Sequence, residues 1–84
     1  MSRYDKLIAR VINAPQNITF EELDKVLISE GCRRSQPKGG SSHYIYHRDD
    51  LEGLLCVPYK KQHLNKIYVK KAIEWLNLEE KYDG

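Results

Sequence analysis

The chain has 84 residues, so it forms one small domain in which most residues must serve a single hydrophobic core. Lys and Arg number 14 and Asp and Glu number 12, so the net charge is only +2 and bulk composition alone does not indicate a nucleic-acid-binding protein. We expect no signal peptide at the N-terminus, and no apolar run approaches the ~18 residues needed to span a bilayer. We therefore expect a soluble cytoplasmic protein without membrane contact.

The two cysteines, Cys32 and Cys56, lack the spacing of metal ligands. Both fall where strands are predicted, which fits reduced intracellular thiols better than a disulfide framework. We expect both to be small core residues. We also expect the protein to need neither a metal nor another cofactor.

Helical spacing of apolar residues predicts two helices in the first third of the chain. The first runs from about 3–13 and ends before Pro15. The second starts after Thr19, whose side chain and that of Glu22 have the spacing of a capping box. Gly31 supplies the positive-φ residue that ends it.

The pattern then changes to that of strands. Residues 32–36 are short and polar, which suits an edge strand, and the aromatic and branched residues 43–47 predict a central antiparallel strand. After a turn containing Gly53, residues 54–57 form a third strand, closed by Pro58. Alternation gives the central strand two faces, one with His43, Ile45 and His47 and the other with Tyr44 and Tyr46, and either face can meet the helices.

A last helix is predicted over 65–78, with Trp75 half buried, and residues 79–84 are expected to be a frayed polar tail. The result is an α+β domain of order α-α-β-β-β-α, with a three-stranded antiparallel sheet covered by helices on one face. This order contains the α-β-β-β-α arrangement of a double-stranded-RNA-binding domain.

The glycine turn before the central strand is the best candidate for chemistry. Two successive glycines allow positive φ and close approach to an anion, and Gly40, Ser41 and Ser42 can hold a phosphate through backbone N–H and hydroxyl donors. The imidazole of His43 can move a proton to or from a ribose or phosphate oxygen held beside it. The alternative is that His43 is only a hydrogen-bonded polar residue at the start of a strand.

Basic residues gather in the middle of the chain, with acidic residues on either side, a distribution that fits an anionic partner. In a three-stranded meander they can converge on one edge and follow a phosphate backbone, although each one alone is also typical of a solvated surface. Tyrosines 44, 46, 59 and 68 can stack on bases or pack in the core. The basic residues assigned to RNA binding are Arg34, Lys38, Lys60, Lys61, Lys66 and Lys70.

Four segments in fixed order resemble the HicA family of type II toxin-antitoxin toxins, over about residues 19–78. They are Gly31-Cys32-Arg33-Arg34, Gly40-Ser41-Ser42-His43-Tyr44-Ile45-Tyr46-His47, Val57-Pro58-Tyr59 and Leu64-Asn65-Lys66-Ile67-Tyr68-Val69-Lys70-Lys71. The resemblance implies a double-stranded-RNA-binding type of fold, metal-independent cleavage of messenger RNA, and neutralisation by a HicB antitoxin that covers the active site.

By the same resemblance, His43 takes the catalytic position, and Gly40 with Ser41 or Ser42 takes the preceding Gly-Ser position. The chain departs from the family in its additional serine, which leaves two candidates for the equivalent hydroxyl. Residues 1–18 extend beyond the family core, and we expect this extra helix to pack on the domain without adding chemistry. Two rival functions are a non-catalytic RNA-binding module and a protein-interaction domain.

Overall fold

A computed structural model of the chain describes residues 3–36 and 42–82. The sheet has the strand order β1-β2-β3, with both neighbouring pairs antiparallel, as the meander predicts. The elements in chain order are α1 (Arg3–Asn13), the 3-10 helix η1 (Pro15–Asn17), α2 (Phe20–Ser29), β1 (Arg33–Ser35), β2 (His43–His47), β3 (Leu55–Pro58), α3 (Lys66–Leu76) and α4 (Leu78–Tyr82).

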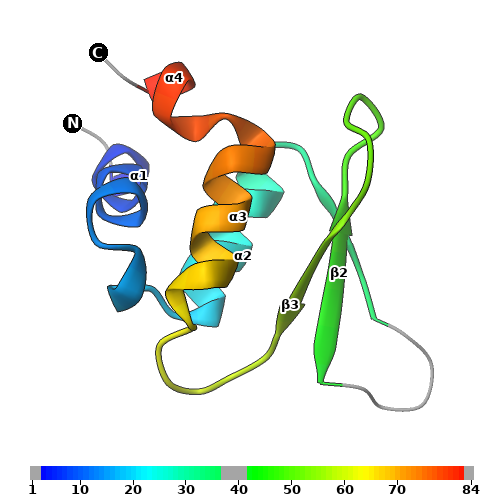
Figure 1. Cartoon of the computed structure of the whole chain (residues 1–84), viewed down its shortest axis with the longest axis horizontal. Coiled ribbons are helices and arrows are strands. Elements are labelled where there is room, and N and C mark those ends of the chain that lie inside the picture. Colours follow the sequence, from blue (N-terminus) through cyan, green and yellow to red (C-terminus); the bar gives the residue numbers. More distant parts are fainter. Residues whose placement is uncertain (1–2, 37–41, 83–84) are drawn as a thin grey trace.

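The elements form layers. Figure 1 shows α2 and α3 between the sheet and α1, with α4 near α1 at the same side of the molecule. The core fills the space between the sheet and the two middle helices and includes Leu23 of α2, Val57 of β3 and Val69 of α3, all fully buried. The α+β class, the antiparallel sheet and the packing of the N-terminal helix are therefore confirmed.

The tyrosine face of β2 is the one that meets the helices. Tyr46 is fully buried and Tyr44 half buried, whereas His43 is exposed. Ile45 lies opposite Cys56 across the sheet. In the described part of the chain no helix covers the face that carries Ile45 and its neighbours (Figure 1).

The predicted boundary signals act as expected at the start and end of α2. Thr19 Oγ1 accepts a hydrogen bond from Glu22 N at 3.2 Å, and Thr19 N donates to Glu22 Oε1 at 3.0 Å. Gly31 follows with φ of +93°, a conformation that only glycine adopts without strain. The two hydrogen bonds between Thr19 and Glu22 satisfy backbone donors that the start of a helix otherwise leaves without partners.

Two expectations from the sequence are wrong. Residues 79–82 are not frayed tail: Asn77 adopts a left-handed conformation (φ 55°), which ends α3, and the fully buried Leu78 begins α4. Cys56 is exposed, because alternation along β3 places it on the open face of the sheet. Cys32 is buried as expected.

One buried carboxylate joins both ends of the chain to α2. Glu30 Oε2 accepts hydrogen bonds from the hydroxyls of Tyr4 in α1 and Tyr82 in α4, each at 2.6 Å. Its Oε1 accepts one from Lys81 Nζ at 2.6 Å, and its side chain is only 3% exposed. Burial by itself raises the pKa of this carboxyl, but the hydrogen bonds from Lys81, Tyr4 and Tyr82 outweigh burial and hold the pKa below its ordinary value.

We predict that Glu30→Gln lowers the free energy of unfolding at neutral pH by about 1–3 kcal/mol. Since the folded-state pKa of Glu30 is lowered, its contribution is complete above the unfolded-state pKa and is lost as pH falls through the folded-state pKa. The difference in unfolding free energy between wild type and the Glu30→Gln variant should therefore disappear at acidic pH. Urea unfolding at several pH values measures it, with Glu52→Gln as the exposed control. A gap that is independent of pH would contradict this role.

Candidate functional site

His43 lies at the end of the sheet, where β2 begins. It is opposite Pro58, the last residue of β3, and Ser42 O accepts a hydrogen bond from Tyr59 N at 2.7 Å, one residue further along. This contact extends the pairing of the two strands beyond His43. The imidazole is exposed, and its position is fixed by the sheet rather than by a free loop.

The loop 59–65 is attached to the helices on its other side. Leu64 N donates to Ile18 O at 2.8 Å, and His63 pairs with Thr19 in an isolated bridge. Asn65 then caps α3 by accepting a hydrogen bond from Ile67 N at 3.0 Å. Figure 1 shows this loop, the start of β2 and the N-terminal ends of α2 and α3 at the same end of the molecule.

Exposed lysines on and after this loop keep their charge available to a ligand. Lys60, Lys61 and Lys66 form no ion pair with any residue in the described ranges. The first turn of α3 contains no acidic residue, so its backbone N–H groups add to the positive potential there. The arginines of the sheet region differ, because each already faces a carboxylate: Arg33 with Asp49, Arg34 with Asp24 and Arg48 with Asp50.

Two of the predicted RNA-binding residues do not join His43 on its face of the sheet. Arg34 is paired with Tyr46 across the strands, so it lies on the helix-facing side. Lys70 is exposed but lines a hollow with Ile12 and Pro15, on the side of α3 that faces α1. Lys38, Gly40 and Ser41 lie outside the described residues, whereas Ser42 is described and exposed.

Arg34 belongs to a network that sequence reasoning missed. Asp24 Oδ1 accepts hydrogen bonds from Arg34 Nη1 at 3.0 Å and from the Tyr46 hydroxyl at 2.6 Å. The guanidinium also lies over the ring of Tyr44, 5.4 Å from its centroid. The Asp24 carboxylate raises the pKa of Arg34, and burial raises the pKa of Tyr46. No local motif could reveal this network, since its members are 10 and 22 residues apart.

The tyrosines divide between core and surface. Tyr46 is in the core, which excludes base stacking by its ring. Tyr44 and Tyr59 both contact Phe20, with ring centroids 5.1 Å away in each case. Tyr59, the first residue of the loop 59–65, is 42% exposed, so its ring is better placed than those of Tyr44 and Tyr46 to stack on a base.

No known protein family, curated protein or solved structure matches the chain. Across the described ranges, no three His, Cys, Asp or Glu side chains are grouped as metal ligands. Nor does any described helix combine the length and apolar character required to cross a bilayer.

We predict that Tyr46→Phe lowers the free energy of unfolding by about 1 kcal/mol, because Asp24 loses one of its two hydrogen bonds while the ring stays packed. Tyr68→Phe is the matched control, since no partner for the Tyr68 hydroxyl is found among the described residues. Urea unfolding of the three proteins gives the comparison. Equal stabilities for both variants would show that the Tyr46 hydroxyl bond contributes nothing.

Proposed function

We propose that this protein is an endoribonuclease toxin of a type II toxin-antitoxin system, similar to HicA toxins, that cleaves messenger RNA with His43. The observation that carries the proposal is the exposed imidazole of His43 at the sheet end where the loop with Lys60 and Lys61 returns to the helices. The order α2-β1-β2-β3-α3 supports a double-stranded-RNA-binding type of fold as well.

The chemistry requires one proton transfer that an imidazole performs well near neutral pH. His43 removes the proton of a ribose 2′-hydroxyl, or returns one to the leaving 5′-oxygen. The 2′-oxygen forms a bond to phosphorus as the bond to the 5′-oxygen breaks, which gives a 2′,3′-cyclic phosphate and a 5′-hydroxyl. Lysine charge beside the phosphate stabilises the transition state.

Because His43 performs one of the two proton transfers, a second group must perform the other, and few residues can do so. Lys38, Lys60, Tyr44 and His63 are the candidates that the sequence offers. Tyr44 points to the helix side of β2, away from the face of His43, and contacts Phe20. Lys60 and His63 are both exposed in the loop that follows β3, so they are the better choices among the described candidates.

The same surface is the proposed contact of a HicB-like antitoxin. An exposed histidine, an exposed tyrosine and lysines that form no ion pair within the described part of the chain give a partner both apolar and charged contacts. Covering His43 would block access of RNA to the imidazole, which is how such a partner neutralises a toxin of this kind.

We predict that His43→Ala reduces cleavage of single-stranded RNA by about 100-fold or more, the usual contribution of general acid-base catalysis. Purified protein is incubated with labelled RNA, and mass spectrometry identifies the cyclic phosphate product. His47→Ala is the control, because His47 lies on the same face of the same strand. Both variants are checked for folding by circular dichroism.

Cleavage by His43→Ala at the wild-type rate would remove His43 from the mechanism. RNA that is bound but remains intact with wild-type protein would favour the non-catalytic RNA-binding module. The absence of any salt-dependent RNA binding would leave only the alternative that the chain is a protein-interaction domain.

We predict that Lys60→Gln with Lys61→Gln weakens RNA binding and lowers the slope of log affinity against log salt by about 0.7 for each lysine. The measurement uses the His43→Ala background, so that the RNA stays intact. The control pair, Lys6→Gln with Lys25→Gln, removes the same charge from a hollow between α1 and α2. An equal loss in both pairs would show that net charge, not this loop, attracts RNA.

A further inference from the structure

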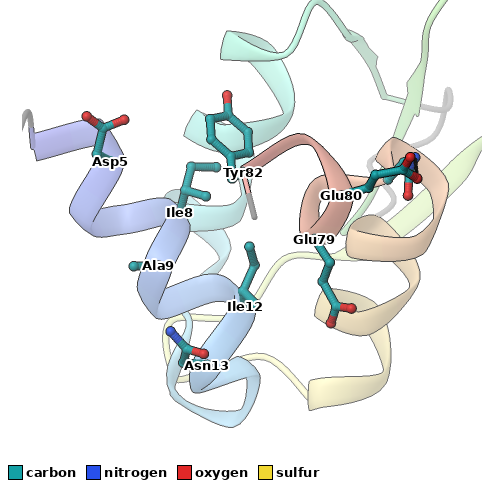
Figure 2. A pocket seen from close by; sticks show the side chains of 9 residues that line it. Asp5, Ile8, Ala9, Ile12, Asn13, Glu79, Glu80 and Tyr82 are labelled. Carbon is teal, nitrogen blue, oxygen red and sulfur yellow. Dashed lines mark hydrogen bonds between the residues drawn. The ribbon is translucent and has the colours of Figure 1, made fainter. Parts of the chain in front are cut away.

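A groove separates α1 from α4 on the side of the molecule away from the sheet. Its volume is about 760 Å³. Figure 2 shows Ile8 and Ile12 pointing from α1 toward α4, with Glu79 on the opposite wall. We call this hollow the α1–α4 groove; its apolar floor is Ile8, Ala9 and Ile12, and its charged lining is Asp5, Glu79 and Glu80.

The charged residues that line the groove are all acidic, although the chain as a whole is positive. The cations of α1 lie on its other face, where Arg3, Lys6 and Arg10 line the hollow next to α2. Lys81, the cation of α4, does not line the groove; its ammonium donates a hydrogen bond to Glu30 at 2.6 Å and lies 5.6 Å from the ring centroid of Tyr82, which does line it. The groove is therefore complementary to a basic partner, not to RNA.

The shape of the groove favours a helix. Two helices form its walls, and its floor has apolar residues at positions 8, 9 and 12, the spacing that one helix presents to another. Ala9 and Ile12 are half buried, so apolar surface remains for a ligand to cover. Glu79 provides a contact for a Lys or Arg side chain at the edge of such a helix, and Glu80, whose Oε2 accepts a hydrogen bond from Asn77 Nδ2 at 2.8 Å, adds negative charge next to it.

We propose that the α1–α4 groove binds a basic amphipathic helix of a partner protein. The groove is built by α1 and α4, and its lining residues, apart from Asn77, lie outside the 19–78 segment that resembles HicA toxins. It is separated from His43 by the layer of α2 and α3 (Figure 1), so RNA and this partner can be bound together. The proposal does not depend on ribonuclease activity.

The test uses a fluorescent amphipathic peptide of about 14 residues, or about four helical turns, with Leu and Ala on one face and Lys on the other. Anisotropy gives its affinity for the full chain, and amide chemical shifts locate it. We expect the shift changes to centre on Ile8, Ala9, Ile12 and Glu79. A peptide with Glu in place of each Lys should bind at least about tenfold more weakly, a difference of about 1.4 kcal/mol.

Two variants separate groove binding from non-specific charge attraction. Glu79→Lys should weaken the lysine peptide about fivefold, while Glu52→Lys, with the same charge change in the turn before β3, should leave it unchanged. Ala9→Arg fills the groove with a good helix former and should weaken binding at least about tenfold. RNA cleavage should be unaffected by all three substitutions.

The proposal is overturned if the wild-type chain does not bind the lysine peptide, or if Ala9→Arg binds it as well as wild type. Equal weakening by Glu79→Lys and Glu52→Lys also overturns it, because attraction would then follow net charge. Sedimentation equilibrium tests a second copy as the occupant: self-association that Ala9→Arg abolishes would assign the groove to this chain itself.

Discussion

Tyr46 is fully buried in the middle of β2, and the pleat of this strand turns every alternate side chain to the opposite face. With Tyr46 in the core and its hydroxyl bonded to Asp24, the strand cannot shift by one residue without exposing the ring and burying a histidine. The exposed position of His43 thus follows from a contact three residues away. The candidate site and the core therefore lie on opposite faces of the same strand.

The second constraint is the carboxylate of Glu30, which adds polar bonds between α1, α4 and the end of α2, three segments that also share the hydrophobic core. Its three hydrogen bonds come from Tyr4, Lys81 and Tyr82, at opposite ends of the chain. A buried charge is stable only when it is well paired, so α1 and α4 must both be in place for Glu30 to remain ionised. Both walls of the α1–α4 groove are accordingly bonded to the same carboxylate, that of the C-cap residue of α2.

How well sequence predicted each part depended on how local its determinants are. The capping box of Thr19 and Glu22, the positive φ of Gly31 and the alternation of 43–47 involve neighbours within a few residues, so pattern alone locates these features. The hydrophobic period likewise places α3: the predicted range 65–78 exceeds the observed Lys66–Leu76 by one residue at its start and two at its end.

The features that sequence missed rest on contacts between distant residues. The helix α4 is short and polar, and it is stabilised by bonds from Lys81 and Tyr82 to Glu30, about 50 residues earlier. The sheet face that Cys56 occupies depends on which side of β2 meets the helices, a choice that alternation alone leaves open. For the candidate site, the sequence was enough to name His43 and the loop lysines, but it could not predict the ion pair between Arg34 and Asp24.

The unequal environments of the two thiols have a practical consequence. Cys32 is enclosed, and burial raises the pKa of its thiol, so its reactive thiolate form is scarce. Cys56 stands in solvent on the open face, opposite Ile45 and one strand from His43. The natural chain therefore has a selective attachment point for a fluorophore or spin label, and a probe there would register any molecule that approaches the uncovered side of the sheet.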